Sequence, residues 1–399
     1  MKKTLLLAAM ATLAAFQAKA GTVTSDGADI VIKTKGGFEA RTADGKYSFA
    51  VGGRAQLDYN DFDGVINAVP GESGSDLFFR RARIEIKGHA LDWGYTLSYN
   101  LTGGGSVDQI HTTYKGWGKM AKLTFGQQKE DFGLEDTTSS KWITAMERAM
   151  PSSAFDTGNN LGVKLHGAND LFTYSLGAYK NGIDSSNDLD TAVTGRVVLR
   201  PLMDGANLLH IGAGITDRSG SSADYNARLG VRGGEDGSGV SRVRARMSGF
   251  RGDRRDYNLE LLAQFGPVHV AAEYFDGEID VDDPAGTTIE ADGYYVQAGW
   301  IVTGESRGYK TDIAGWDKVK PTSPGGAWEV FARYDTLDVA NAAPVSVTGE
   351  KADSWTLGVN WYVSPLVKAS VNYVRVNTDS AIGGEDDGDA LTARLQVAF

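Results

Sequence analysis

The side chains in this sequence with the clearest chemical potential are arginines near the middle of the chain. Six arginines fall within fourteen residues, and only Asp253 opposes them. They are Arg242, Arg244, Arg246, Arg251, Arg254 and Arg255. Alternate side chains of an extended chain point to one side, so the first three would share a face. Because a planar guanidinium pairs with phosphate or carboxylate oxygens, we predict a cationic track for anions. A solvated charge run is the alternative.

A second set of basic side chains lies in two segments in which apolar and polar residues alternate. Arg54 belongs to the polar set of one segment, and Arg81 and Arg83 belong to the polar set of the next. Arg80 has the parity of the apolar residues around it. Period-2 alternation is typical of strands with one apolar and one polar face. We therefore expect Arg54, Arg81 and Arg83 to face the same side of a sheet.

Other chemistries find little support. The absence of cysteine excludes thiol catalysis, cysteine-ligated zinc and disulfides. The five histidines show no His-x-x-x-His spacing, and we expect neither a metal nor a cofactor. Gly304–Gly308 fits the Gly-x-Ser-x-Gly pattern of a nucleophile elbow, but it lies in a predicted turn rather than between a strand and a helix. We therefore expect a protein that is not an enzyme.

Alternation recurs along almost the whole chain and predicts about sixteen strands. They lie near residues 47–60, 77–88, 92–102, 107–116, 121–127, 160–167, 171–180, 191–201, 207–218, 256–266, 267–276, 293–303, 327–337, 353–362, 366–377 and 389–399. An even number of roughly ten-residue strands flanked by aromatics is typical of an outer-membrane barrel. The predicted fold is all-β, a transmembrane antiparallel β-barrel. A soluble periplasmic sandwich or propeller is the alternative, which the polar second faces and the aromatic strand ends disfavour.

The connections and the chain start fit a barrel in the outer membrane of a Gram-negative bacterium. Most connections alternate between short and long, as periplasmic turns and outside loops do; residues 304–326 are a long exception on the short side. Residues 1–20 have the charged start, apolar stretch and Ala-Lys-Ala end of a secretory signal. We expect residues 21–46 to form a periplasmic lead-in and residues 47–399 to form the barrel.

Two long inserts are expected to fold inward and narrow the pore. The connection 128–159 is too long for a plain loop, and its middle, residues 139–148, is predicted to be a short helix capped by serine. The second insert, 219–256, carries the arginine track. An outward Arg80 would cost roughly 2–4 kcal/mol at mid-depth of the membrane, so we expect a bulge that turns it inward.

At this point the sequence resembles the phosphate- and polyphosphate-selective porins, the O/P porin family. The motifs are Asp131-Phe132-Gly133-Leu134-Glu135, Ser139-Ser140-Lys141-Trp142, Gly52 to Tyr59, Phe79-Arg80-Arg81-Ala82 and Leu357 to Tyr362. The resemblance implies a trimeric sixteen-stranded barrel with an anion-binding constriction and an arginine ladder.

The resemblance also assigns roles to individual residues. It makes Arg54, Arg80 and Arg81 constriction arginines, Ser139 and Ser140 hydroxyl donors, and Asp108 a pore acid. It places the ladder loosely at the arginines from Arg242 onward. Arg83, predicted to face inward from its parity, would add to the positive charge.

Two departures from the family reduce the expected positive charge. Strongly phosphate-selective members carry lysine where this chain has Asp136 and Gly94. Passive diffusion of small anions, phosphate first and polyphosphate second, remains the leading function. A general porin, or one for dicarboxylates or sugars, is the alternative.

Charge and partners complete the expectation. The net charge of −11 becomes −14 without the three lysines of the signal, because 37 basic residues then face 51 acidic ones. That balance argues against nucleic acid as a partner. The expected partners are small anions, two further copies in a homotrimer, and outer-membrane lipids. Acidic segments at 276–292 and 379–389 would lie in outside loops and share divalent cations with lipopolysaccharide, or be merely solvated.

Overall fold

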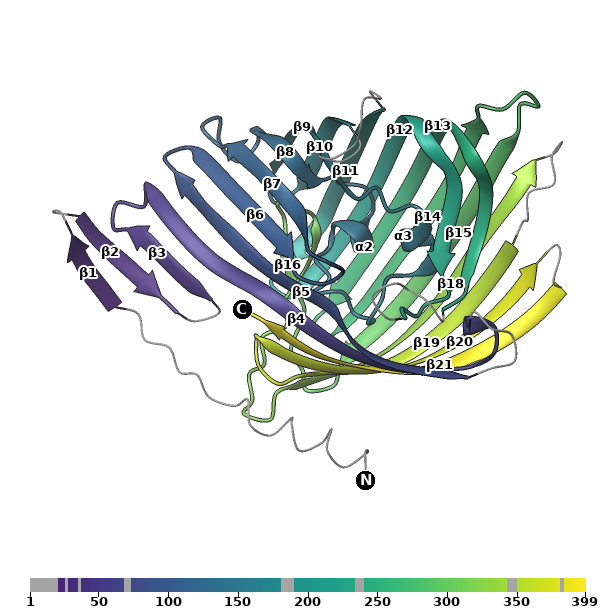
Figure 1. Ribbon diagram of the computed structural model, residues 1–399. Coiled ribbons are helices and arrows are strands. Elements are labelled where there is room, and N and C mark those ends of the chain that lie inside the picture. The colour runs from purple at the N-terminus through teal and green to yellow at the C-terminus, as the bar shows by residue number, and fades with distance from the viewer. Residues whose placement is uncertain are drawn as a thin grey trace.

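The computed structural model of the protein is a closed antiparallel barrel (Figure 1). The structure describes residues 21–25, 28–34, 37–67, 73–180, 190–233, 240–342, 350–380 and 384–399. The predicted signal, residues 1–20, lies outside the described residues. Sixteen strands pair each with its successor, and β21 pairs with β4 to close the sheet. The predicted sixteen-stranded barrel is therefore confirmed.

The barrel strands are β4 (Tyr47–Phe62), β5 (Gly74–Ala90), β6 (Trp93–Asn100), β7 (Ser106–Tyr114), β8 (Lys122–Lys129), β9 (Asn159–Ala168), β10 (Phe172–Lys180), β11 (Thr191–Asp204), β12 (Asn207–Arg228), β13 (Arg242–Phe265), β14 (Val268–Val281), β15 (Thr288–Ile301), β18 (Ala327–Ala342), β19 (Glu350–Tyr362), β20 (Val367–Ser380) and β21 (Gly384–Ala398). The predicted alternation is visible in β19, where Trp355 and Leu357 are exposed while Thr356 and Asn360 are buried. An outer surface of exposed apolar side chains suits lipid, because these side chains lose no free energy by facing hydrocarbon.

Closure of the barrel depends on a glycine. The last residue, Phe399, exchanges backbone hydrogen bonds of 2.7 and 3.1 Å with Gly53. A Cβ atom on Gly53 would stand 2.3 Å from the backbone oxygen of Arg83. The seam therefore has no room for a side chain at this position. Three short strands, β1 (Gly21–Ser25), β2 (Ala28–Lys33) and β3 (Phe38–Thr42), extend the sheet from the start of β4.

Two strands are longer than the sequence predicted. β12 and β13 continue into the segment expected as an insert, with register shifts between Arg218 and Ser221 and between Ser222 and Asp224. We call their extension, the described residues of 219–251, the inner hairpin. Its apolar residues share one cluster with inward residues of β14, β15, β18 and β20. The inner hairpin thus lies inside the barrel against its wall.

The connection between β8 and β9, residues 130–158, also folds into the lumen, and we call it the constriction loop. The helix predicted at 139–148 is wrong: short helices α2 (Leu134–Thr137) and α3 (Met150–Ala154) flank an irregular stretch. Seven carbonyls between residues 140 and 147 accept hydrogen bonds from other parts of the lumen. The donors are Gln56, Gln396, Arg307, Lys368, Asn360, Arg394 and Arg333. These side chains replace the bonds that a helix would make within itself.

Residues 304–326, which we call the lumen insert, enter from the opposite end. They include a small hairpin of β16 (Gly308–Lys310) and β17 (Gly315–Asp317). The backbone N–H of Trp316 donates to the Thr138 hydroxyl of the constriction loop at 3.2 Å. The two segments therefore meet inside the barrel.

The acidic segment 276–292 is strand over most of its length rather than loop. Asp276 pairs with Asp292 and Glu278 with Glu290 across β14 and β15, and all four point outward. No helix in the described part of the chain is long and apolar enough to cross a membrane.

Candidate functional site: a cation-lined central cavity

A β-bulge turns Arg80 into the lumen. The register between β4 and β5 shifts after Gln56, which pairs with Arg81, while Leu57 pairs with Phe79. Arg80 is the extra residue between them, and its guanidinium donates to both carboxylate oxygens of Glu147 in the constriction loop at 2.9 and 3.0 Å. The bulge that the sequence predicted is present, and it has the usual effect of re-aiming one side chain.

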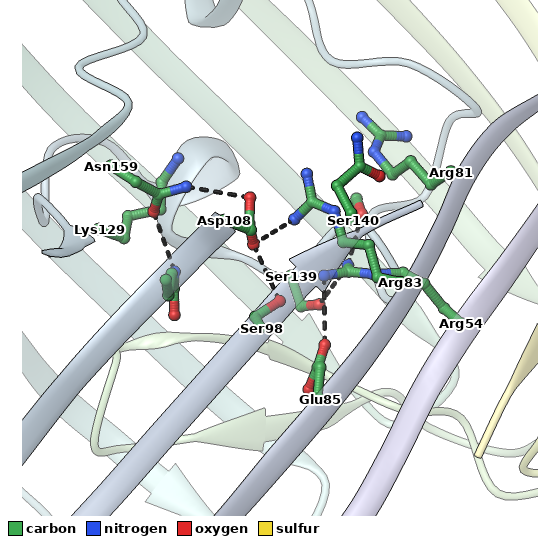
Figure 2. A network of polar contacts seen from close by, with 12 residues as sticks. Arg54, Arg81, Arg83, Glu85, Ser98, Asp108, Lys129, Ser139, Ser140 and Asn159 are labelled. Atoms are coloured by element: carbon green, nitrogen blue, oxygen red, sulfur yellow. Dashed lines mark hydrogen bonds and ion pairs between the residues drawn. The ribbon is translucent and has the colours of Figure 1, made fainter. Parts of the chain in front are cut away.

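A second bulge, which the sequence did not reveal, does the same for Asp108. Ser98 pairs with Gln109 and Tyr99 with Val107, so Asp108 is the extra residue of β7. Figure 2 shows its carboxylate between β5 and β9 side chains. It accepts hydrogen bonds from Arg83 at 2.6 Å, from Ser98 at 3.2 Å and from Asn159 at 3.2 Å.

Arg54 lies against the two serines of the constriction loop (Figure 2). Its Nη1 donates to Ser140 Oγ at 2.7 Å and to Ser139 Oγ at 3.3 Å, and its Nη2 lies 3.3 Å from Glu85. A hydroxyl that accepts from arginine keeps its own O–H free to donate. Arg54, Ser139 and Ser140 can therefore act together as donors toward one anion.

The predicted constriction residues come together around one cavity of about 860 Å³. The residues Arg54, Arg80, Arg81, Arg83, Asp108, Ser139 and Ser140 all line it. Twelve Lys or Arg side chains and six carboxylates line this central cavity, which leaves a surplus of six positive charges. A surplus of one sign between low-dielectric walls concentrates counter-ions. The cavity is therefore suited to anions although the chain as a whole is acidic.

Asp136, the first of the two departures noted in the sequence, is enclosed by cations. Its Oδ1 lies 2.7 Å from Lys129 and 3.1 Å from Arg148. Burial, and then the neighbouring Asp156, raise the pKa of Asp136 to about 6, although both cations oppose the shift. Asp136 therefore carries its negative charge at neutral pH and loses it in mild acid.

The second departure, Gly94, leaves space that a neighbouring side chain occupies. A Cβ atom on Gly94 would stand 2.8 Å from the Lys115 ammonium nitrogen. Lys115 therefore brings a positive charge beside Gly94.

The structure divides the arginine track. Val243 and Ala245 belong to the apolar cluster against the wall, so Arg244 and Arg246, which are exposed, and half-buried Arg242 lie on the face turned to the lumen. The other three arginines have separate places. Arg251 bonds the Gly220 carbonyl at 2.6 Å, Arg254 is paired with Asp256 at 2.7 Å, and exposed Arg255 pairs with Asp217 at 2.6 Å.

The sequence analysis missed several charged residues of the cavity. Arg232 and Lys129 line it, and Arg228 joins Arg232 in a smaller cavity of about 240 Å³ that Arg80 and Arg81 also line. Arg228 continues the alternation of the inner hairpin, which was a usable signal. Arg232 and Glu147 lie in irregular segments, where spacing carries no information about direction.

Comparison with known proteins identifies the family. Residues 49–399 match the family described as phosphate-selective porin O and P. The chain belongs to this family. It is 39% identical to porin O of Pseudomonas aeruginosa over 98% of this chain and 97% of that protein. This porin is therefore a channel of the outer membrane of a Gram-negative bacterium.

Solved structures share the fold at low identity. An anion-selective porin from Comamonas acidovorans has a TM-score of 0.58 at 15% identity and covers 88% of this chain and all of its own. OmpT of Vibrio cholerae in its trimer form has a TM-score of 0.56 at 11% identity, over 88% of this chain and 99% of that one.

Ser306 of the elbow-like motif lies in an irregular stretch before β16, and no helix follows it among residues 304–326.

Proposed function

We propose that this porin conducts small oxyanions, with phosphate as the preferred solute, by passive diffusion through the central cavity. The observation that carries the proposal is the surplus of six positive charges in its lining. The field draws anions in, and the donors at Arg54, Ser139 and Ser140 replace part of the hydration shell for a short time. Binding must remain weak enough for release.

The individual residues have different roles in this proposal. Arg54 and Arg81 bind the anion, and Arg80 adds charge from its bulge. Asp108 orients Arg83 rather than repelling solute, because its carboxylate accepts hydrogen bonds from Arg83, Ser98 and Asn159. Arg242, Arg244 and Arg246 attract anions from the lumen face of the inner hairpin.

A measurement of reversal potential tests the proposal. Purified porin in a planar bilayer under a potassium chloride gradient should give a potential of the sign expected for anion flow. Phosphate added to the chloride should then reduce the chloride current with saturation. A reversal potential of the opposite sign, showing cation preference, would contradict the proposal.

A dicarboxylate is the second candidate solute. The Arg80 fork already binds a carboxylate, that of Glu147, through two hydrogen bonds, and arginine accepts carboxylate and phosphate with similar geometry. Titration of the chloride current with succinate and with phosphate separates the two. Stronger inhibition by succinate would favour the second candidate.

We also propose cleavage after Ala20, a periplasmic place for residues 21–46, assembly as a homotrimer and contact with lipopolysaccharide. The signal-like composition of residues 1–20 supports the first. The trimer form of a similar solved barrel supports the third. Outward carboxylates such as Asp276 and Asp292 suit bridging cations at the lipid headgroups. Mass spectrometry of the mature protein in detergent would test cleavage and assembly together.

A further inference from the structure

One carboxylate of the constriction loop lies among four arginines. Glu147 receives two hydrogen bonds from Arg80 and one of 2.7 Å from Arg394. Its oxygens also lie 3.7 Å from Arg81 Nη1 and 3.6 Å from Arg232 Nε. The four guanidiniums come from β5, β21 and the inner hairpin. Glu147 is therefore the point at which three separate parts of the lumen converge.

The four arginines are not equally committed to Glu147. Arg394 has a carboxylate of its own, because Asp58 accepts two hydrogen bonds from it at 2.7 Å. Arg80 makes its hydrogen bonds within the described residues only to Glu147. Arg232 is a third exposed and has Glu147 as its ion-pair partner. Arg394 is thus structural, whereas Arg80 and Arg232 depend on Glu147.

Arg80, Arg81 and Arg232 also reach a cavity, although Arg81 is largely buried. With Arg83 and Arg228 they line the smaller cavity of about 240 Å³, whose lining contains five arginines and no carboxylate. The same lining contains the polar residues Asn100, Thr102 and Ser106. An oxyanion in this cavity would meet the free N–H groups of arginines whose other N–H groups Glu147 already holds.

We propose that Glu147 is a tethered competitor for the transported oxyanion. Its carboxylate occupies the fork of Arg80 and offsets the charge of Arg81 and Arg232, so it weakens anion binding in the smaller cavity and speeds release. This inference rests on the proposed function and adds the residue that sets its affinity. The surrounding arginines hold the pKa of Glu147 well below its usual range, against the effect of burial, so the competitor remains charged.

The geometry also distinguishes classes of solute. A carboxylate that fills two sites of a guanidinium fork is displaced best by a solute that offers two oxygens in the same arrangement. Phosphoryl and carboxylate groups do so, whereas chloride offers one point charge. Glu147 therefore discriminates against halides while permitting oxyanions.

The test uses the full-length porin with Glu147→Gln, and Glu305→Gln as the matched control. Glu305 of the lumen insert bonds Thr303 and Thr322 and lines neither cavity. Inhibition of chloride current by inorganic phosphate should become tighter by roughly tenfold in E147Q, because one opposing charge leaves an arginine cluster. It should not change in E305Q.

A double-mutant cycle with Arg80→Gln separates competition with the anion from a purely structural role of Glu147. In wild type R80Q removes a cation whose fork Glu147 already occupies, so phosphate binding should weaken; in the E147Q background, where the fork is free for phosphate, R80Q should weaken binding by a larger factor and remove most of the gain. An intact E147Q barrel, shown by heat-modifiable migration on SDS gels, with unchanged or weaker phosphate affinity would overturn the proposal.

A second variant covers the case in which E147Q does not fold. Glu147→Asp keeps the charge but is one methylene shorter, so it should loosen the Arg80 fork and tighten phosphate binding by roughly twofold. A folded E147D with wild-type affinity would then overturn the inference. Cation preference of the wild-type pore would instead contradict the proposed function, so the two failures are distinguishable.

Discussion

The two sides of the lumen use the same residue types for opposite purposes. On the side of β4 to β9, the central cavity is lined by twice as many cations as carboxylates. On the side of β11 to β20, which we call the packed side, buried cations meet buried acids: Arg196 lies 2.6 Å from Glu260, and Arg307 lies 2.9 Å from Glu329.

Packing explains the difference. The constriction loop and the lumen insert cover the packed side and exclude water, so every charge there needs a partner. Arg196 also donates to the Ile313 and Ala314 carbonyls, and Arg307 to Thr144 and Trp142. Along the cavity, water solvates the surplus cations, and the surplus can persist. The comparison shows that access of solvent, rather than residue composition, determines whether charged side chains form a packed interior or line the pathway of the anion.

The largest effect should come from Arg307→Met on the packed side. It leaves the buried Glu329 charge with only neutral partners and Lys368 nearby, and a broken buried pair costs about 3–5 kcal/mol. The free energy of unfolding in urea, followed by tryptophan fluorescence, should fall by that amount, and open-channel noise should rise as the constriction loop loses its Thr144 contact. Arg255→Met, on an exposed pair, is the control and should unfold like wild type. Equal stability of both variants would contradict the conclusion that buried charges on the packed side need their partners.

Arg54→Ala should act on function instead. It removes the donor to Ser139, Ser140 and Glu85, and hydrogen bonds to charged groups contribute about 1.5–3 kcal/mol. Phosphate inhibition of the chloride current should weaken by at least roughly tenfold. Arg375→Ala, an exposed arginine at the rim, should leave it unchanged. An unaltered anion conductance in R54A would point to a broad pore with little selectivity.

Acidification should increase the surplus of positive charge in the central cavity, because Asp136 takes up a proton. Because its folded pKa is about 6, above the ordinary 3.8, the folded protein takes up a proton as pH falls from 7 to 5. The central cavity then gains one positive charge, so the anion-to-cation permeability ratio should rise severalfold. The same group adds stability that is complete below about pH 3.8 and is lost as pH rises through about 6. Asp136→Asn should remove the step near pH 6 in bilayer reversal potentials; its persistence would assign the step to another group.

The smallest effect should come from the lumen face of the inner hairpin. Replacing Arg244 and Arg246 by Gln removes two exposed charges that attract anions at a distance. The phosphate association rate should fall by roughly twofold in dilute salt and match wild type near 1 M salt, where charges are screened within about 3 Å. An effect that survives high salt would place these arginines in direct contact with solute.

Much of the architecture follows from the sequence alone. The period-2 pattern determines strands, their number and the inward direction of Arg54, Arg81 and Arg83, because one face must meet lipid and the other water. The cost of a charge in hydrocarbon was enough to predict the bulge at Arg80. The inward-folding inserts were recognisable from their length.

Tertiary structure decided the rest. The helix predicted at 139–148 fails because side chains distant in sequence, such as Asn360 and Lys368, bind its carbonyls. The second bulge at Asp108, the position of Glu147 among four arginines and the inward fold of residues 304–326 depend on contacts across the lumen. Local periodicity determines which face a strand residue takes, but only the closed barrel determines which opposite residue it meets and whether water reaches it.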